Sequence, residues 1–306
     1  MSHSDSSSPR IAQVSPEEWS LAVPLLWSDL PPEQRERAQQ AILDSKANWP
    51  AEIWGAYRGD VLVGAMRAQA QPGRSALIAA PRLVNGEPTA TAVALLDRVL
   101  AVLRGQNVQV VQALLGSAER EEEILRGGGL AHVGELIYML CLAPQFPQAP
   151  EHSPQASTLA FDAYTPERHT RLARVVERTY VGSLDCPAAD GLRSVDDVLA
   201  TYRGTGPFDP SRWLIACDGD QDFGCVIIAD DPAHDQSELM YIGVIPEARG
   251  RKLGPSLVRH AQWLTREAGR ARLVLAVDAA NHPAIAVYSA AGFIQWNWRS
   301  VFLRAL

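Results

Sequence analysis

One stretch decides the fold: residues 238–254 read ELMYIGVIPEARGRKLG. Residues 239–245 are apolar and partly β-branched, which is typical of a strand that is covered on both faces. Pro246 cannot donate a backbone hydrogen bond to a neighbouring strand, so strand pairing should end there. Pro255 fits the first turn of a helix. Apolar residues then recur at helical spacing, at Leu253, Leu257, Val258, Ala261 and Leu264. The stretch therefore predicts a buried strand, a loop, and a helix that begins directly after the loop.

The loop at 246–254 has the features of an anion site. Backbone N–H groups of a glycine-bearing loop and of an uncapped helix N-terminus point outward together, and the helix dipole adds positive potential. Three side chains add full positive charges, namely Arg249, Arg251 and Lys252. Loops of this kind also occur as plain connectors between a strand and a helix, so the loop alone does not specify a ligand.

The sequence RGRKLG at 249–254 resembles the pyrophosphate-binding motif of the GNAT superfamily of acyl-CoA N-acyltransferases, Arg/Gln-x-x-Gly-x-Gly/Ala, and a Val-x-Pro strand end precedes it as in that family. The family usually has glycine where this chain has Lys252, whose side chain could weaken the phosphate cradle or add a cation to it. The resemblance implies acetyl-CoA as the cofactor and no metal site. It implies these cofactor-binding residues: Tyr241, Ile242, Gly243, Val244, Arg249, Gly250, Arg251, Lys252, Leu253, Gly254 and Asn281.

Composition limits the classes of partner and compartment. The 306 residues are 47% hydrophobic and 21% charged, and a typical domain of ~100–200 residues makes two domains the better expectation. The net charge of −7 argues against nucleic-acid or anionic-membrane partners and is compatible with a cationic amine. No apolar run approaches the ~20 residues of a membrane span, and residues 1–9 are polar rather than signal-like. The four cysteines form no CxxC pair, which favours free thiols. We therefore expect a cytoplasmic protein.

A proline-rich segment at 144–157 reads as an extended linker. The order of expected strands and helices repeats after this linker, which predicts one domain at 10–143 and a second at 158–306. Residues 1–9 are expected to form a disordered tail. Residues 54–64 and 213–224 both enclose strand, Gly-Asp turn and strand. We interpret this as an internal duplication, with two tandem GNAT-like domains of α/β class, each a mixed sheet, in the arrangement of the mycothiol synthase-like members. The alternative is that any two α/β units of this size would look this similar.

The two halves differ at the loop before the helix. Residues 81–89 of the first half read PRLVNGEPT, with one glycine, one acidic residue and no basic cluster. A pyrophosphate needs converging N–H donors and positive potential, whereas this loop contains a carboxylate and a proline that has no N–H. We therefore expect the first half to be a degenerate copy, and one cofactor per chain held by the second half.

Acyl transfer from a thioester to an amine needs a base for the amine, a stabilised oxyanion and a proton for the leaving thiolate. Glu238 begins the strand and stands eight residues before Pro246, the spacing at which mycothiol synthase-like members carry their base. A solvated glutamate at a strand end is an equally compatible role. The oxyanion donor is expected to be a backbone N–H within 241–244, where the strand is splayed from its neighbour. Reserve candidates for the base are Asp230, Asp231 and Asp235.

A second motif supplies the acid. Residues 281–293 resemble the family's Asn-x-x-Ala-x-x-x-Tyr and Gly-Phe motif, with Asn281 and Tyr288 seven residues apart and so on one side of a helix. The resemblance implies that Tyr288 is the general acid and that Asn281 lies near the pantetheine. Helix N-cap and core aromatic are the alternative roles of these residues.

The insertion after the first helix of the second half lines the acceptor site in the superfamily. It makes Tyr180, Asp185 and Cys186 candidate substrate contacts. Together these residues predict an N-acetyltransferase that moves an acetyl group from acetyl-CoA to a primary amine, on a small molecule or a peptide, by direct attack through a tetrahedral intermediate. The alternative is a non-catalytic acyl-CoA-binding sensor or scaffold. The sequence leaves the oligomeric state open.

Overall fold

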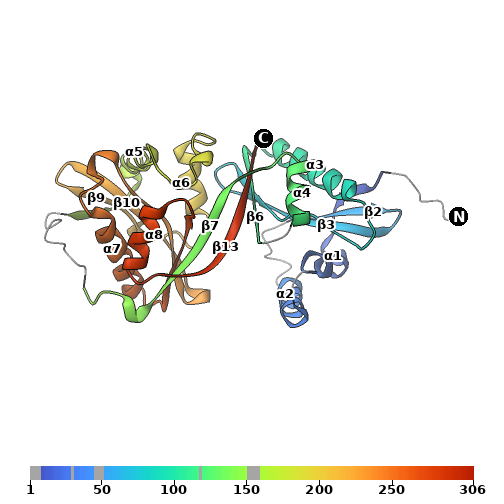
Figure 1. Ribbon diagram of the computed structural model, residues 1–306, viewed down its shortest axis with the longest axis horizontal. Helices are drawn as coiled ribbons and strands as arrows, with labels where there is room; N and C mark the ends of the chain where they lie inside the picture. Colours follow the sequence, from blue (N-terminus) through green and yellow to red (C-terminus); the bar gives the residue numbers. More distant parts are fainter. Residues whose placement is uncertain (1–7, 29–30, 45–51, 117–118, 150–158) are drawn as a thin grey trace. The chain divides into compact units, whose positions relative to one another are not determined.

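The computed structural model describes residues 8–28, 31–44, 52–116, 119–149 and 159–306. The predicted tail at 1–9 and the predicted linker at 144–157 therefore lie largely outside the described residues. Contacts between residues divide the chain into two compact units (Figure 1). Unit 1 comprises residues 1–133 with 300–306, and unit 2 comprises residues 134–299.

Unit 1 is a mixed sheet in the order β1-β2-β3-β4-β6, with β5 beside β3. Its strands are β1 (Arg10–Gln13), β2 (Glu52–Arg58), β3 (Val61–Gln71), β4 (Ser75–Ile78), β5 (Arg82–Leu83) and β6 (Val110–Leu115). The pair β4–β6 is parallel, and the others are antiparallel. The helices are α1 (Trp19–Leu26), α2 (Pro32–Asp44), α3 (Thr89–Gly105) and α4 (Glu119–Gly127). The apolar stripe of α3, which includes Leu95, Leu96 and Val99, packs into the core of this unit.

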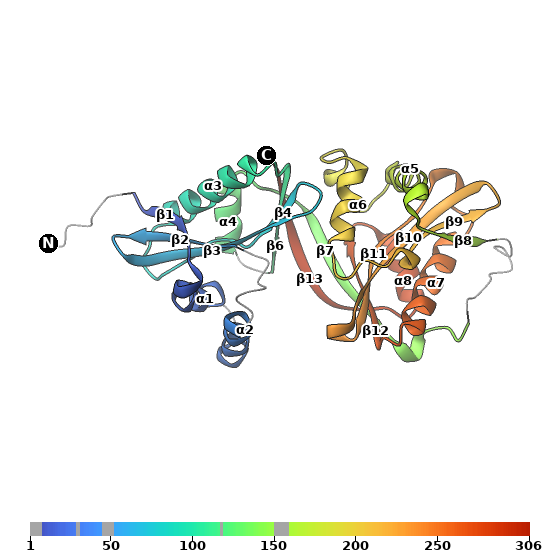
Figure 2. The same cartoon turned by 180° about the vertical axis from the view of Figure 1, so that it is seen from behind.

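Unit 2 is a second mixed sheet in the order β7-β12-β11-β10-β9-β8. Its strands are β7 (Ala131–Leu142), β8 (Ala160–Ala163), β9 (Trp213–Asp218), β10 (Gln221–Asp231), β11 (Gln236–Val244) and β12 (Arg272–Asp278). Its helices are α5 (His169–Tyr180), α6 (Val195–Arg203), α7 (Leu253–Glu267) and α8 (His282–Ala290). Figure 2 shows β8 to β11 of this sheet from the side opposite to Figure 1.

Two cores cover the two faces of the sheet in unit 2. Leu257, Val258 and Ala261 of α7 pack with Leu239 and with α8 in one core. Leu172 and Val176 of α5 pack in the other core with α6 and with alternate residues of β9 and β10. The strand and helix predicted from 239–264 are therefore present, as β11 and α7, and both sides of β11 are covered.

Part of the last strand of each half lies in the other unit. In β7, residues 136–142 pair antiparallel with β12 of unit 2, although they belong to the first half of the sequence. In β13 (Ile294–Ala305), residues 300–305 pair antiparallel with β6 of unit 1. The compact units therefore divide at 133/134 and 299/300, and not at the predicted boundaries of 10–143 and 158–306. A residue pattern identifies a strand but not its neighbour, so this exchange has no local signal.

The described beginning of the predicted linker is packed rather than extended. Ala143–Gln145 form a turn of 3-10 helix, and Phe146 is only 4% exposed in the core that contains Met139 and Cys141. The prolines at 144 and 147 were interpreted as linker residues, whereas an aromatic side chain between them ties this stretch to unit 2. Within the described ranges, no helix is both long and apolar enough to cross a membrane.

Candidate functional site

The strands β11 and β12 pair only where they begin. Gln236 faces Arg272, Ser237 faces Leu273 and Glu238 faces Val274, and beyond this point these two fully described strands part. β11 continues to Val244 along β10 alone. The splay expected from the sequence is therefore present in the protein itself. It leaves the β12-facing backbone groups of β11 available to another partner.

A β-bulge lies at the same place. Ile227 of β10 faces Tyr241, whereas the next residue, Ile228, faces Leu239, so Met240 is the extra residue on β11. A bulge bends its strand and increases the local twist. The bulge thus turns residues 241–244 away from β12, and it explains why the two strands separate after Glu238.

The opening between these strands contains a cavity of about 170 Å³. Its wall combines apolar side chains with a few polar ones. The residues of this wall are Thr179, Ser183, Asp185, Leu239, Met240, Tyr241, Ile242, Gly243, Val244, Gly254, Val258, Ala276, Val277, Asn281, Ala284, Val287 and Tyr288. The cavity therefore brings together eight of the predicted site residues from β11, α7, α8 and the loop after α5. Glu238, Tyr180, Cys186 and residues 249–253 lie outside this wall.

The N-terminus of α7 adjoins this cavity through Gly254. Among the described residues no side chain caps α7, and its first turn contains no acidic residue. The first backbone N–H groups of a helix have no partner within the helix, so they can bind an anion. Lys252 is the N-cap and has φ 60°, in the left-handed region that favours glycine. This explains why glycine is usual at this position in the family.

Gly254 has no packing reason to be glycine. A Cβ atom added there would meet only Val287 Cγ2, at an ordinary 4.0 Å, and its φ is not positive. Gly243 is different, because a Cβ atom there would lie 2.7 Å from Thr179 Cβ. Gly243 therefore allows β11 to approach α5, whereas the space at Gly254 remains open for a ligand that comes close to the backbone. The residues present thus fit a pyrophosphate-bearing cofactor.

Arg249 is used inside the protein. Its guanidinium donates to the backbone oxygens of Thr179 (2.9 Å), Gly182 (3.1 Å) and Val244 (3.2 Å). It therefore ties the end of α5 to the end of β11 and does not point freely toward an anion. Arg251 lies with its Cζ 4.5 Å from the centroid of the Phe223 ring. Arg249 and Arg251, two of the three basic residues of the loop, therefore have partners within the protein.

Tyr288 and Asn281 face the same cavity, as their spacing predicts. Tyr288 is 7% exposed and packs with Phe293, at 5.7 Å between ring centroids. Burial, and to a smaller extent the Asp185 carboxylate, raise the pKa of the Tyr288 phenol, which therefore stays protonated and can donate. Asn281 Oδ1 accepts from the Ala284 backbone N–H at 3.4 Å and caps α8. Both residues combine their structural roles with a place on the cavity wall.

The loop after α5 is joined to the end of β12 by two carboxylates. Asp185 Oδ1 accepts from the Asp278 N–H at 3.0 Å, and Asp278 Oδ2 accepts from the Cys186 N–H at 3.1 Å. Burial raises the pKa of the Asp185 carboxyl, and the nearby Asp278 charge adds to this. Burial also raises the pKa of the Cys186 thiol to about 12, so this thiol is not a nucleophile at neutral pH.

Glu238 lies one residue before the cavity wall, on the opposite face of β11 from Leu239. Burial is the main cause that raises the pKa of its carboxyl, and the charge of Asp231 adds to it. A carboxylate with a raised pKa is a better proton acceptor than an ordinary surface glutamate.

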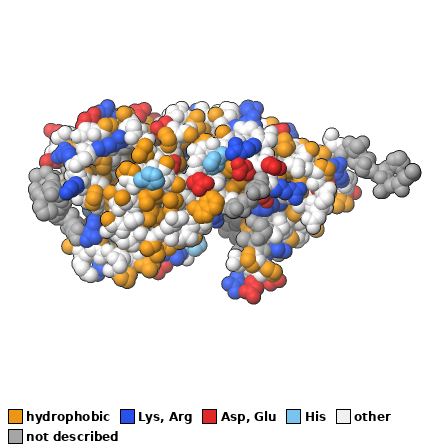
Figure 3. Space-filling model, in the orientation of Figure 1, with side chains coloured by type: hydrophobic (Ala, Val, Ile, Leu, Met, Phe, Trp, Pro, Cys, Tyr) orange, Lys and Arg blue, Asp and Glu red, His pale blue; other side chains and the backbone are white. Residues whose placement is uncertain are grey.

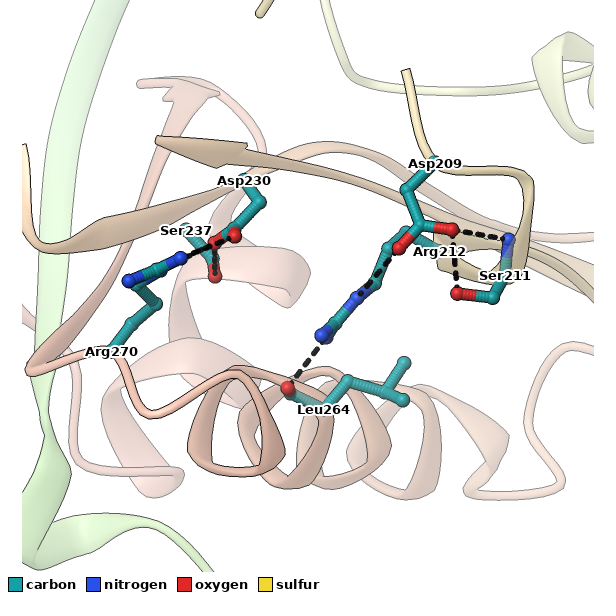
Figure 4. Close-up of polar contacts among 7 residues, drawn as sticks. All are labelled: Asp209, Ser211, Arg212, Asp230, Ser237, Leu264 and Arg270. Atoms are coloured by element: carbon teal, nitrogen blue, oxygen red, sulfur yellow. Dashed lines mark hydrogen bonds and ion pairs between the residues drawn. The ribbon is translucent and has the colours of Figure 1, made fainter. Parts of the chain in front are cut away.

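The three reserve aspartates are held by other partners. Arg270 donates to both oxygens of Asp230, at 2.9 and 2.8 Å, and lowers the pKa of this carboxyl; Figure 4 shows the pair with Ser237, beside a separate contact of Arg212 with the Leu264 carbonyl. Asp231 pairs with His234, and Asp235 accepts from the Ala271 N–H. The three aspartates are thus tied to neighbouring groups, whereas burial raises the pKa of the Glu238 carboxyl.

Comparison with known proteins agrees with this geometry. Residues 183–293 match the family described as Acetyltransferase (GNAT) family. The chain carries a GNAT-family domain. Mycothiol acetyltransferase of Pseudarthrobacter chlorophenolicus is 33% identical over 95 residues, which is 29% of this chain and 29% of that relative. The match therefore spans less than a third of the length of this relative.

The GNAT fold extends over both units. A GCN5-related N-acetyltransferase from Sphaerobacter thermophilus aligns with a TM-score of 0.65 at 14% identity, over 97% of this chain and 96% of that one. A tandem GNAT protein from the clavulanic acid biosynthesis pathway aligns with a TM-score of 0.53 at 15% identity, over 97% and 98%. At such identities the likeness concerns the fold. The chain consists of two GNAT-like units with mixed α/β sheets.

Several residues in or next to the candidate site had not been predicted from the sequence. Asp278 was missed, although a polar residue that ends a buried parallel strand is a recognisable signal. Tyr202 packs on Tyr241 at 6.0 Å between ring centroids, and Thr179 Oγ1 lies 2.6 Å from the Tyr241 hydroxyl. Neither position carries a motif. Within the described residues, no group of three or more His, Cys, Asp or Glu side chains is placed to hold a metal ion.

Proposed function

We propose that this protein is an acetyl-CoA-dependent N-acetyltransferase with its active site in unit 2. The observation that carries the proposal is the splay of β11 from β12, which opens a cavity beside the uncapped N-terminus of α7. The GNAT-family match over residues 183–293 covers the same elements. Acetyl-CoA supplies an activated acetyl thioester when bound.

The binding role falls to backbone groups. The N–H groups of residues 250–254 and the dipole of α7 would hold the pyrophosphate, with the open space at Gly254 allowing close approach. The unpaired edge of β11 at 241–244 would hydrogen-bond the pantetheine arm and offer an N–H to the oxyanion. Arg249 would position this site by fixing the end of β11, and not by contacting phosphate.

The proton transfers fall to two side chains. Glu238 would accept a proton from the acceptor ammonium, directly or through one water, so that the amine nitrogen can attack the thioester carbon. Tyr288 would donate its proton to the sulfur as the carbon–sulfur bond breaks, and the second proton that the nitrogen loses in becoming an amide would restore the phenol. The acidic groups near the cavity, Asp185 and Asp278, favour an acceptor that arrives as a cation. The acceptor is a primary amine on a small molecule or a peptide.

The test combines binding and turnover on the full chain. Calorimetric titration with CoA is expected to give one equivalent per chain. Thiol release from acetyl-CoA across a panel of primary amines is expected to depend on the amine and to yield the acetylated product by mass. Saturable CoA binding with no thiol release for any amine would favour the sensor or scaffold alternative, and no CoA binding would refute the cofactor assignment.

A further inference from the structure

Unit 2 exposes large apolar side chains on one face of β13. Ile294, Trp296 and Trp298 occupy alternate positions, so they point to the same face, and they are 59%, 54% and 38% exposed. Figure 3 shows hydrophobic side chains gathered on the surface over β7 and β13. Large apolar side chains that are exposed side by side mark a surface that contacts a ligand or a partner. This aromatic strip has no role in the site described above.

The strip is connected to the cavity through the sheet of unit 2. Glu238 pairs with Val274, and Val274 pairs with Leu140 on its other side. Two residues further along, Ala276 pairs with Tyr138, so Tyr138 lies on the same face as Glu238. Ala276 is exposed on this face and belongs to the cavity wall. A continuous surface therefore leads from the cavity across Ala276 to Tyr138.

Tyr138 joins this surface to the aromatic strip. Its ring meets Trp296 edge to face, with centroids 6.0 Å apart. Burial raises the pKa of the Tyr138 phenol, Arg299 opposes this, and the Glu238 carboxylate adds to it. Arg299 is in turn held by Asn297, whose Oδ1 accepts from Arg299 Nη1 at 2.5 Å. The proposed base and the aromatic strip thus belong to one surface.

We propose that Trp296 and Tyr138 form a subsite for the body of the acceptor, and that the acceptor is a primary amine carrying a ring. The ring would stack on the Trp296 indole while the amino group reaches Glu238. This inference rests on the proposed function and adds the substrate class. A flat ring buries a large area against an indole at little loss of conformational freedom. The strip spans only a few side chains, far below the ~800 Å² that a stable protein partner would cover.

The sheet geometry sets the length of this acceptor. Glu238 and Tyr138 are two strands apart, at ~4.8 Å per strand, and two residues apart along the strand, which places their Cα atoms roughly 12 Å apart. The ring must therefore be separated from the amino group by about 10 Å. A sugar ring with a C–H face and an aromatic ring share the required flat surface, and only an assay can distinguish them.

The experiment compares three acceptors of equal spacer length on the full chain: phenylheptylamine, aminoheptyl glucoside and heptylamine. Trp296→Ala is expected to raise KM for at least one ring-bearing acceptor by roughly 10-fold, with kcat and the KM of acetyl-CoA nearly unchanged. Heptylamine should be almost unaffected. Trp296→Phe should restore most of the loss, and Leu21→Ala, which removes an exposed apolar side chain of unit 1, is the matched control.

The outcomes separate this subsite from the proposed function. An equal rise in KM for heptylamine, or no rise for either ring-bearing amine, would overturn the subsite while leaving the transferase intact. If the wild-type chain acetylates no amine, titration of phenylheptylamine or the glucoside followed by tryptophan fluorescence still decides the question. Saturable binding that is lost in Trp296→Ala supports the subsite, and equal affinity in wild type and variant refutes it.

Discussion

The helix α3 of unit 1 and the corresponding helix α7 of unit 2 are preceded by different residues. In unit 1, Glu87 stands directly before α3, and its carboxylate is bound by Arg58 at 2.8 Å and by the Thr91 hydroxyl, with only 8% of its side chain exposed. Neither α3 nor α7 has a capping side chain or an acidic residue in its first turn, but in unit 2 the basic residues Arg251 and Lys252, and not a glutamate, stand directly before the helix. Unit 1 therefore supplies its own anion at this helix end, whereas unit 2 leaves the position to a ligand.

The strands in front of these helices differ in the same sense. All four residues of β4, Ser75–Ile78, pair with β6. Only three of the nine residues of β11 pair with β12. In the same fold, a few residues around this helix N-terminus therefore decide whether a carboxylate of the protein occupies it or whether it stays open to an anionic ligand. We infer that unit 1 is the degenerate copy and that only unit 2 binds CoA.

The largest effect is expected when the arrangement of unit 1 is placed in unit 2. Gly254→Glu adds a carboxylate to the first turn of α7, where it repels a pyrophosphate and fills the space that a ligand needs. The Kd for CoA is expected to rise by about 1000-fold, as for an unpaired like charge in a binding site. The midpoint temperature of thermal unfolding, Tm, should be unchanged or slightly higher, because an acidic residue in the first turn stabilises a helix.

Calorimetric titration measures this change, with Gly254→Ala as the matched control. The added methyl group meets Val287 at an ordinary distance, so only a modest loss of affinity is expected. Wild-type affinity in Gly254→Glu would remove the pyrophosphate from α7. Two equivalents of CoA per wild-type chain would refute the inference that only unit 2 binds CoA.

The second largest effect is expected at Tyr288, the proposed general acid in unit 2. Tyr288→Phe keeps the ring that packs against Phe293 and removes the hydroxyl. We expect kcat to fall by about 100-fold, within the range for loss of a general acid, with CoA affinity nearly unchanged. Steady-state kinetics with calorimetry measure both quantities. An unchanged kcat would leave Tyr288 with its core role alone.

An effect of similar or smaller size is expected at Glu238, in the pH dependence of kcat/KM. Because burial raises the pKa of Glu238, the acid limb of kcat/KM should lie above the ordinary glutamate range, and activity should rise as pH increases through this raised pKa. Glu238→Gln should remove the limb and lower the plateau by about 10–100-fold. Acceptors of different basicity separate the limb from the amine's own ionisation. A limb that persists unmoved in the variant would place the base elsewhere.

The smallest effect is expected in unit 1. Arg58 holds the pKa of the Glu87 carboxyl below its usual range, so this group stabilises the fold above its unfolded pKa, and the contribution is lost as pH falls through the lower folded pKa. Glu87→Gln should cost about 1–3 kcal/mol of unfolding free energy at neutral pH and little in strong acid. Urea unfolding at several pH values measures this.

Glu123→Gln is the matched control for this change, because it removes one acidic charge from an exposed position of α4. An equal loss of stability in both variants would attribute the effect to net charge. If Glu87→Gln binds a second equivalent of CoA, the Glu87 carboxylate is the single feature that prevents unit 1 from binding CoA.

Local patterns carried much of the prediction. The β11 strand, the loop and α7 follow from apolar spacing, Pro246 and Gly250, which act over a few residues. The shared cavity of Asn281 and Tyr288 follows from their spacing on one helix. The role of Arg249 could not be predicted, because its three carbonyl partners lie on segments far apart in the sequence.

Properties that depend on neighbouring strands also escaped the sequence. The exposure of Trp296 could not be predicted, because it depends on what covers the sheet. The backbone ties among Asp185, Cys186 and Asp278 join residues more than ninety positions apart. The exchange of β7 and β13 depends on which sheet edge each strand pairs with, and no local pattern in the chain specifies that edge.

The exchange of these two strands gives the chain an order of events during synthesis. β6 leaves the ribosome early, but residues 300–305, which cover its edge, follow only after the whole of unit 2 has been made. Unit 2 meets no such delay, because β7 already precedes the rest of its sheet. The nascent chain must therefore carry an unpaired edge strand in unit 1 for most of translation, the kind of edge that recruits chaperones or aggregates. Unit 2 can close its sheet first, so the half that is synthesised first is the half that finishes folding last.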